Sequence, residues 1–396
     1  MAMRVARSLQ DIDARQWNAL IGDGSPFLRH EFLLALEQSG CATRDTGWDP
    51  YFLLHENADG ALGGAMPLYL KAHSWGEFVF DFPWAEAYQR AGLRYYPRLV
   101  CAVPFTPACG PRLLAGESAD ADSMRHALVE AACALARELG ASSLHVLFAD
   151  ARDRTALAAA GLLARLDCQF HWHNAAYGAF EDFLAAFTAQ KRKKVRRERR
   201  RVTEAGITLT TLHGGDLDVA LIDTIFRLHA ETFARHGHAP YLNGDFFRRL
   251  AGAMPQSLVV ELATRHGEVI ACSVSLRGRD ALYGRYWGAA GEHHSLHFET
   301  CYYRGIEYCI REGLARFEPG TQGEHKLLRG FAPAPVWSMH DIVDTRFAAA
   351  IGSWLVRERA HRRAYLRAAA GHLPFRRADI PARLPLDVRD CLAAED

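Results

Sequence analysis

SLVVELATRHGEVIACSVSLRGRDALYGRYWG (residues 257–288) contains three strand-like runs separated by two short turns, the first of which ends at Gly267. Apolar and aromatic runs bounded by Gly and Asp are typical of an antiparallel meander. The first half of the chain has the same order of segments: YFLLHE (51–56), a turn ending at Gly60, ALGGAMPLYL (61–70) and EFVFDF (77–82). The repeat is one of pattern and not of residue identity. It predicts two domains of one architecture.

Helices and further strands follow each meander. Residues 123–139 have apolar positions at helical spacing, and SSLHVLFA (142–149) and ARLDCQFHWHN (164–174) predict two strands around a short Ala-rich helix. In the second half, residues 295–312 predict a helix and LARFEPG (314–320) predicts a strand. A meander followed by alternating helices and strands indicates an α/β or α+β layered sheet, present twice.

Length and composition agree with an ordinary globular protein of two domains. The chain has 396 residues, of which 49% are hydrophobic and 23% charged. We place the domains at 1–177 and 178–345, with a C-terminal helix and a Pro-punctuated tail at 346–396. No segment predicts a membrane span or a secretory signal. Nine cysteines without CxxC pairs suit reduced thiols in a cytoplasmic protein, and the histidines lack the partners of a zinc site.

QKRKKVRRERRR (190–201) concentrates nine Lys or Arg in eleven positions, although the formal net charge of the chain is +1. Apolar residues from Phe180 to Val202 predict one amphipathic helix that ends at Gly206, with its basic end matching the helix dipole. One interpretation is therefore a surface helix with a favourable charge gradient. Because the like charges repel one another, the other is a site for a phosphate, a nucleotide sugar or RNA that includes Lys194 and Arg197.

Residues 281–333 (ALYGRYWGAAGEHHSLHFETCYYRGIEYCIREGLARFEPGTQGEHKLLRGFAP) resemble the FemAB-like, or "peptidogalycan biosynthesis", family of GNAT-fold proteins. SPFLRHEFLLALE (25–37), YYPRLVCAVPFTPACGPRLL (95–114) and QKRKKVRRERRRV (190–202) support the resemblance. It implies two tandem GNAT-like domains in a FemABX-like arrangement. It also implies an N-acyltransferase (EC 2.3 class) without a tightly bound cofactor. The donor would be acyl-CoA or aminoacyl-tRNA, and the acceptor a small-molecule or peptide amine.

Fem-type transferases, which this stretch resembles more distantly, carry a Lys that supports transfer shortly before a Gly or Phe. Lys326, ahead of Gly330 and Phe331, is the matching position. The long helical arm of the larger Fem proteins has no obvious counterpart in this chain.

Acyl transfer to an amine also needs a base and donors for the tetrahedral oxyanion. Glu261, within an apolar strand, is a candidate for a buried carboxylate base, and an exposed strand position is the alternative. Glu299, Tyr303 and Glu307 recur every four residues and share one helix face, so Glu299 and Tyr303 are also catalytic candidates. Surface ion pairing with Arg304 or Arg311 is the alternative there.

RYWGAA (285–290) fits the pyrophosphate pattern of acetyltransferases, in which a Gly-containing loop presents backbone N–H groups at a helix N-terminus. The EHKLLRG segment, the following helix and the Pro-rich PFTPACGPR stretch add further polar groups. The residues predicted to bind substrate or cofactor are Arg285, Tyr286, Trp287, Gly288, His297, Arg329, Arg112, Lys194 and Arg197. For Arg112, a rigid connection between strands is an equally good interpretation.

A second hypothesis differs in class: a non-catalytic protein that binds RNA or another anionic ligand on the same fold. Such a binder would need only the basic helix. Polar side chains also cluster in the second meander and in EHKLLRG, which favours the enzyme.

Overall fold

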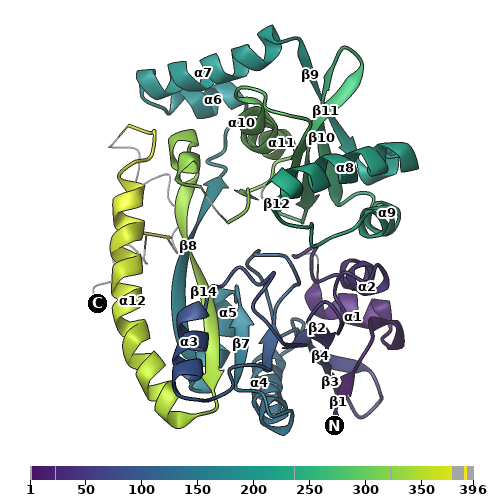
Figure 1. Cartoon of the computed structure of the whole chain (residues 1–396), viewed down its shortest axis with the longest axis vertical. Helices are drawn as coiled ribbons and strands as arrows, with labels where there is room; N and C mark the ends of the chain where they lie inside the picture. The colour runs from purple at the N-terminus through teal and green to yellow at the C-terminus, as the bar shows by residue number, and fades with distance from the viewer. Residues whose placement is uncertain (1, 23, 236, 322, 377–387, 390–396) are drawn as a thin grey trace. The chain divides into compact units, whose positions relative to one another are not determined.

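The computed structural model describes residues 2–22, 24–235, 237–321, 323–376 and 388–389 (Figure 1). The chain divides into two compact units. Unit 1 contains the chain up to Asp167 together with Val336–Arg362, and unit 2 contains Cys168–Pro335 and the chain from Arg363. The chain therefore changes units within β8 (Leu163–His173), β14 (Ala332–Ile342) and α12 (Thr345–Ala370). The first change lies inside a strand, earlier than the boundary near Gly178 expected from the sequence.

Unit 1 is built on two sheets. The smaller has the order β1-β3-β4, and the larger continues from β2 through β5, β6 and β7 to the second part of β14. Their bounds are β1 (Ala2–Ala6), β2 (Trp48–Pro50), β3 (Phe52–Glu56), β4 (Leu62–Met66), β5 (Leu68–Lys71), β6 (Arg98–Cys101) and β7 (Ser143–Leu147). The helices are α1 (Ala14–Ile21), α2 (His30–Gln38), α3 (Phe82–Arg90), α4 (Ala121–Glu138) and α5 (Ala151–Ala159). Apolar residues of α4 pack against the buried strands β6 and β7.

The strand expected at EFVFDF (77–82) is wrong. Gly76 and Phe78 have φ values of 80° and 58°, which a continuous strand does not include, and α3 begins at Phe82. Glu77 is buried and accepts a hydrogen bond from Arg98 on β6 at 2.6 Å, and Asp81 pairs with the same guanidinium. The alternating pattern thus belongs to a loop that holds a buried ion cluster.

Unit 2 contains the meander of residues 257–288, and the prediction of its three strands is confirmed. Its strands have the order β8-β13-β12-β11-β10-β9, and all neighbours are antiparallel except β12 and β13. The bounds are β9 (Ile207–His213), β10 (Leu258–Arg265), β11 (Glu268–Arg277), β12 (Ala281–Ala289) and β13 (Arg316–Glu318). The helices are α6 (Phe180–Ala185), α7 (Ala189–Glu204), α8 (Val219–Arg235), α9 (Gly244–Ala253), α10 (Leu296–Phe298) and α11 (Arg304–Arg311). A π-helical segment, Glu299–Tyr303, joins α10 to α11, and Glu324–Arg329 form a 3₁₀ helix.

Successive residues of β12 contact different layers of unit 2. A Cβ added at Gly288 would lie 2.5 Å from the backbone of Leu228 and His229, so α8 packs directly on the strand at this glycine. The ring of the preceding residue, Trp287, lies 5.3 Å from the ring of His297 in α10. Alternation along the strand therefore places α8 against one face of the sheet and the α10–α11 helix against the other.

The basic stretch forms a helix, but the single helix expected from Phe180 is wrong. The chain breaks between α6 and α7, where Phe187 makes an isolated bridge with Phe375. Val195 and Val202 are buried and fix the inner face of α7, and Gly206 follows the helix with a φ of 70°. The expected helix at 123–139 and the expected C-terminal helix within 346–396 are present as α4 and α12. The Pro-punctuated tail lies mostly at 377–387 and 390–396, outside the described residues.

No helix among the described residues is long and apolar enough to cross a membrane.

Candidate functional site

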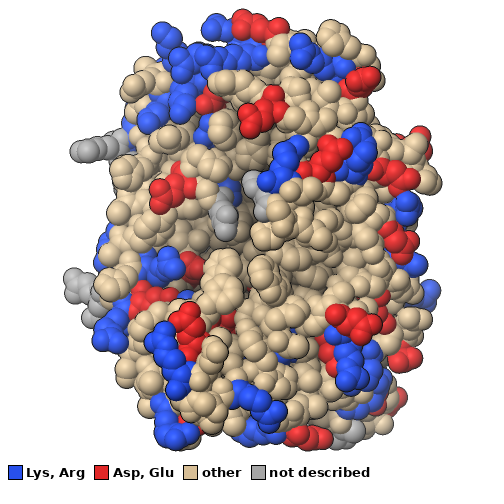
Figure 2. All heavy atoms as spheres, in the orientation of Figure 1, with Lys and Arg blue, Asp and Glu red and all other residues tan. Residues whose placement is uncertain are grey.

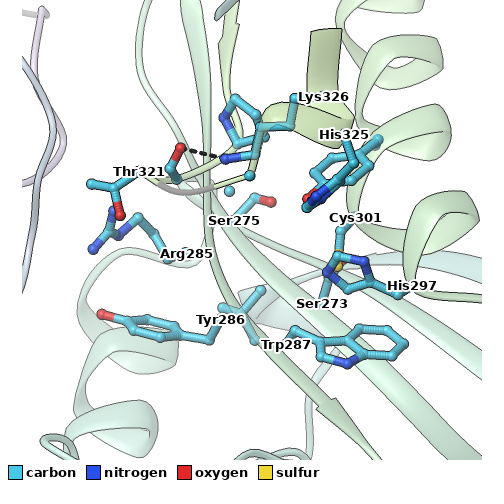
Figure 3. A pocket seen from close by; sticks show the side chains of 16 residues that line it. Ser273, Ser275, Arg285, Tyr286, Trp287, His297, Cys301, Thr321, His325 and Lys326 are labelled. Atoms are coloured by element: carbon cyan, nitrogen blue, oxygen red, sulfur yellow. Dashed lines mark hydrogen bonds between the residues drawn. The ribbon is translucent and has the colours of Figure 1, made fainter. Parts of the chain in front are cut away.

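A pocket of about 570 Å³ lies in unit 2 where β12 and β13 separate (Figure 3). The two parallel strands pair only from Ala281 to Tyr283 on β12 and from Arg316 to Glu318 on β13. Pro319 follows at once and has no N–H with which to continue the ladder. The gap that results is lined by Ser273, Val274, Ser275, Gly284, Arg285, Tyr286, Trp287, His297, Cys301, Tyr302, Pro319, Gly320, Thr321, Gly323, His325 and Lys326.

A β-bulge in β12 shapes one wall of this pocket. Val274 on β11 pairs with Tyr286, whereas the next residue, Ser275, pairs with Gly284, so Arg285 is the extra residue. A bulge bends its strand and re-aims the side chains beside it. Arg285 and Tyr286 both line the pocket, although regular alternation predicts that they face opposite sides of the sheet.

The α10–α11 helix supplies the opposite wall. Its π-helical segment widens one turn, a feature frequently found at functional sites. Cys301 and Tyr302 of this segment line the pocket, together with His297 of the preceding turn. Burial raises the pKa of the Cys301 thiol far above its usual range, so the thiol stays protonated.

Lys326 enters the pocket from the 3₁₀ helix and is only 2% exposed (Figure 3). Its ammonium donates a hydrogen bond to the carbonyl oxygen of Gly320 at 2.6 Å. Burial lowers the pKa of Lys326 to about 7, and the positive charge of Arg285 contributes in the same direction. The residue that the resemblance singled out is therefore a buried amine able to gain or lose a proton near neutral pH.

Two histidines beside Lys326 are neutral at this pH. Burial lowers the pKa of His297 to about 4. Burial, with Arg329 and Lys326 nearby, also lowers the pKa of His325, whose Nε2 lies 2.8 Å from the hydroxyl of Tyr302. The positive charge in the pocket therefore comes from Arg285 and Lys326.

Glu299 and Glu261 do not line the pocket. Glu299 is buried and pairs with Arg199 of α7 at 2.9 Å; burial raises its pKa, and Arg199 opposes that rise. Glu261 is also buried, the first of the two alternatives for this residue, and accepts hydrogen bonds from Arg304 at 3.1 Å and from Thr211. The structure thus places both carboxylates in ion pairs inside unit 2.

Tyr303 and Arg329 meet at Glu198, a buried residue of α7. Arg329 donates to both carboxylate oxygens of Glu198 at 2.9 Å, and the Tyr303 hydroxyl donates to the same carboxylate. The guanidinium of Arg329 also donates to the carbonyl oxygen of His325 at 2.8 Å and lies 3.4 Å from the centre of the Phe298 ring. These contacts hold the 3₁₀ helix that carries Lys326.

RYWGAA (285–290) was expected to form a phosphate-binding loop at a helix N-terminus, and the prediction of that conformation is wrong. Arg285 to Ala289 belong to β12, and Gly288 admits α8 rather than a ligand. The helix that follows begins only at Leu296, after Ser295 in a left-handed conformation. A role for these residues in CoA binding stays a prediction.

Arg112 lies in unit 1 and is 1% exposed. Its guanidinium donates to the carbonyl oxygens of Leu147 at 2.8 Å and Ala108 at 2.7 Å. These contacts brace a connection between strands, the second of the two interpretations that the sequence allowed.

Lys194 and Arg197 lie on α7, whose outer surface carries many cations (Figure 2). The exposed basic residues of α7 define what we call the basic face: Lys193, Arg196, Arg197, Arg200 and Arg201. Arg196 and Arg200 have acidic partners in Glu181 and Glu204. The basic face and the pocket are separate sets of residues.

Sequence reasoning missed Ser273, Ser275 and Thr321, which line the pocket. The two serines alternate along EVIACSVSLRG, so both lie on the same face of β11. Two hydroxyls on one face of an otherwise apolar strand were the available signal. Thr321 offered no comparable signal.

The comparisons with known proteins agree with this fold. The model of the FemAB-like family, described as "Peptidogalycan biosysnthesis/recognition", matches residues 8–377. The chain therefore belongs to the FemAB-like family, as the resemblance implied.

Solved structures extend the likeness to the fold. FemX has 12% identity and a TM-score of 0.55, and the match covers 89% of this chain and 100% of FemX. The C-terminal domain (DUF2156) of a putative lysylphosphatidylglycerol synthetase from Agrobacterium fabrum has 13% identity and a TM-score of 0.53, with 88% and 98% covered. The expected mixed α/β fold class, in a FemX-like arrangement, is confirmed. No curated protein sequence matches the chain significantly.

Proposed function

We propose that the chain is an N-acyltransferase whose reaction takes place in the pocket between β12 and β13. The observation that carries the proposal is Lys326: a buried lysine with a pKa of about 7, held at the point where two strands separate. An amine that attacks an acyl group must lose a proton as the C–N bond forms. A base with a pKa near the working pH serves this step well.

In this proposal neutral Lys326 accepts that proton. Its fixed contact with the carbonyl oxygen of Gly320 uses one N–H and leaves the nitrogen lone pair for the incoming proton. The tetrahedral oxyanion needs donors that are in place before the reaction. Arg285 and the hydroxyl of Ser275 line the same pocket and are the candidates for this role.

Direct attack by the amine suits the pocket better than a covalent acyl-enzyme. Cys301 is the lining residue whose thiol could act as a nucleophile, and burial keeps that thiol protonated. Ser273 donates its hydroxyl to the carbonyl oxygen of Thr300 at 3.2 Å, which engages its proton elsewhere. The amine would add to the acyl carbonyl of the donor, and collapse of the tetrahedral intermediate would break the C–S bond of an acyl-CoA or the ester C–O bond of an aminoacyl-tRNA. The departing thiolate or ribose oxygen would take up the proton that Lys326 accepted from the amine.

The donor is an acyl-CoA or an aminoacyl-tRNA in this proposal, and both are made in the cytoplasm. The basic face of α7 favours a donor with many phosphates, because Lys193 and Arg197 carry exposed charge on neighbouring turns. The family description directs the search for an acceptor to amine-bearing peptides of the cell wall.

A transfer assay tests the proposal directly. The purified chain is incubated with labelled acetyl-CoA or with charged bulk tRNA and a set of amine and peptide acceptors. We expect kcat/KM to rise through about pH 7 as Lys326 loses its proton, and Lys326→Gln to lose at least about a hundredfold in rate. Arg265→Gln, at an exposed cation of β10 outside the pocket, is the charge-matched control. Equal rates for the two variants would exclude Lys326 as the base.

Binding without catalysis is the second candidate function, and the basic face is the observation that favours it. Salt-dependent binding of bulk tRNA, unaffected by Lys326→Gln and accompanied by no transfer to any acceptor, would support it in place of the enzyme.

A further inference from the structure

One end of the pocket in unit 2 is lined by side chains that carry no charge near neutral pH: Ser273, Trp287, His297 and Cys301. Ser273 and Trp287 are partners across β11 and β12. The other two residues belong to the α10–α11 helix that forms the opposite wall. In Figure 3 the four lie together, away from the hydrogen bond that Lys326 makes. We call these four residues the neutral end of the pocket.

The titratable groups at the neutral end are uncharged for physical reasons. Burial lowers the pKa of His297 to about 4, and the positive charges of Lys326 and Arg329 act in the same direction. Burial raises the pKa of the Cys301 thiol, so the thiol keeps its proton. The charge of Arg329 is held in an ion pair by Glu198. A charged group placed at this end would therefore lose its hydration without gaining an oppositely charged partner there.

Packing fixes the walls of the neutral end. The ring of Trp287 is partly buried against an apolar core cluster and lies edge-on to the ring of His297 at 5.3 Å. The hydroxyl of Ser273 donates to the carbonyl oxygen of Thr300 at 3.2 Å, so β11 and the π-helical segment are in contact here. Cys301 is the next residue of that segment and has a small side chain. The neutral end is thus a preformed space with an aromatic wall, which suits an apolar group.

The proposed reaction decides which part of a substrate meets the neutral end. The attacking amine must lie beside the Nζ atom of Lys326, which donates to the carbonyl oxygen of Gly320 beyond the end of β13. The carbonyl oxygen of the donor lies at Ser275, one of the proposed oxyanion donors. The acyl group leaves the reacting carbon by a different bond from the amine. The space away from Lys326 leads along β11 to Ser273, two residues or about 7 Å further.

We propose that the neutral end binds the acyl group of the donor, that the part of this group held there is uncharged, and that Cys301 limits its length. The inference rests on the proposed function and names the substrate class of that site. An acyl-CoA would bring an uncharged aliphatic or aryl chain, and an aminoacyl-tRNA would bring an amino acid with an uncharged side chain. Cys301 is then a specificity-determining residue and not a nucleophile.

Five N-methylbenzamides test the preference for an uncharged group, because each carries the amide that the reaction would form. They are the unsubstituted compound and its 4-methyl, 4-butyl, 4-carboxylate and 4-ammoniomethyl derivatives. Their Kd values are measured by ligand-observed NMR at about pH 7. We expect the 4-methyl probe to bind about fourfold more tightly than the unsubstituted one, the gain for one buried methyl group. Both charged probes should bind at least about tenfold more weakly than the 4-methyl probe.

Three results with the parent chain would overturn the proposal. The first is a charged probe that binds as tightly as the 4-methyl probe. The second is a 4-butyl probe that binds more tightly than the 4-methyl probe, because the proposed limit at Cys301 would then be absent. The third is no binding by any probe at about 20 mM.

Variants of Cys301 locate the effect. Cys301→Leu fills the space at the π-helical segment and should weaken the 4-methyl probe about fivefold or more, with the unsubstituted probe changed less than about twofold. Cys133→Leu, the same substitution on α4 of unit 1, is the matched control. Cys301→Ala removes the sulfur atom and should improve the 4-butyl probe relative to the 4-methyl probe about threefold or more.

Equal effects of Cys301→Leu and Cys133→Leu would contradict the role of Cys301. If Cys301→Leu fails to fold by circular dichroism, Cys301→Ala carries the test alone, and an unchanged ratio of 4-butyl to 4-methyl affinity would contradict the same role. None of these measurements uses acyl transfer. The expected order of affinities without transfer would therefore refute only the proposed function, and transfer without that order only this inference.

Discussion

Removing the carboxylate of Glu198 should destabilise unit 2 strongly. Glu198 is 6% exposed and Arg329 is 3% exposed, so the ion pair between them is closed to water. Glu198→Ala leaves the guanidinium of Arg329 buried without its carboxylate and the Tyr303 hydroxyl without its acceptor. Loss of one partner from a buried pair costs about 3–5 kcal/mol. We expect a loss of that size in the free energy of unfolding.

The same helix offers a matched control. Glu204, also on α7, pairs with Arg200 at 3.4 Å, but both side chains are about two-thirds exposed (65% and 68%). Exposed pairs of this kind contribute about 0–1 kcal/mol. Both substitutions replace Glu by Ala within one helix, so the same side chain is removed in each case. The difference between them isolates the effect of burial.

Urea unfolding followed by far-UV circular dichroism measures the two variants, and the free energies come from linear extrapolation. Hydrogen exchange on α7 peptides then places the loss in unit 2. The double variant Glu198→Ala/Arg329→Met should recover part of the stability, because it removes the stranded charge. If the free energies of unfolding of Glu198→Ala and Glu204→Ala differ by less than about 1 kcal/mol, the ion pair between Glu198 and Arg329 does not hold the 3₁₀ helix of Lys326.

Three further predictions concern single features. Lys326 has a lowered pKa in the folded chain, so the unfolded chain binds more protons between about pH 7 and 10, and stability rises with pH across that window. Lys326→Met should flatten this rise and increase the urea midpoint at pH 7; a steeper or unchanged slope would contradict the burial of the amine. Gly288→Ala should cost about 2–4 kcal/mol because its Cβ meets the backbone of α8, whereas Gly252→Ala in α9, with nothing within 4 Å, should be neutral or stabilising by up to about 1 kcal/mol. Equal midpoints for these two glycine variants would show that α8 does not pack so closely. If bulk tRNA binds the basic face, Arg197→Gln should reduce the slope of log K against log salt by about 1, and the same slope as the parent chain would place the RNA elsewhere.

Much of the fold could be predicted because the meander of unit 2 follows local rules. Gly267 ends a turn with positive φ. The strands around it either alternate between apolar and polar residues or consist of apolar runs, as buried strands do. EFVFDF (77–82) has the same local pattern and is not a strand. Its conformation depends on Arg98, which follows in the sequence at a distance that no short-range pattern reports.

Some residues of the candidate site could likewise be predicted from the sequence, and others depend on distant parts of the chain. Lys326 was singled out by family resemblance and lines the pocket, and its catalytic role stays a prediction. Glu299 and Tyr303 have helical spacing that suggests a shared site, but Arg199 and Glu198 from α7 engage them instead. Partners so far away in the sequence exert no influence on local periodicity. The bulge at Arg285 likewise depends on the register between two strands and not on either strand alone.

The crossings of the chain between units have a consequence for synthesis on the ribosome. The sheet of unit 1 needs the second part of β14, whose Ser338 pairs with Leu147 of β7. That segment is translated only after Cys168–Pro335, which carries nearly the whole of unit 2's sheet, has been synthesised. Unit 1 therefore waits with the edge of β7 unpaired while later residues are made, and a shortened product that stops before Val336 would leave that edge open to association.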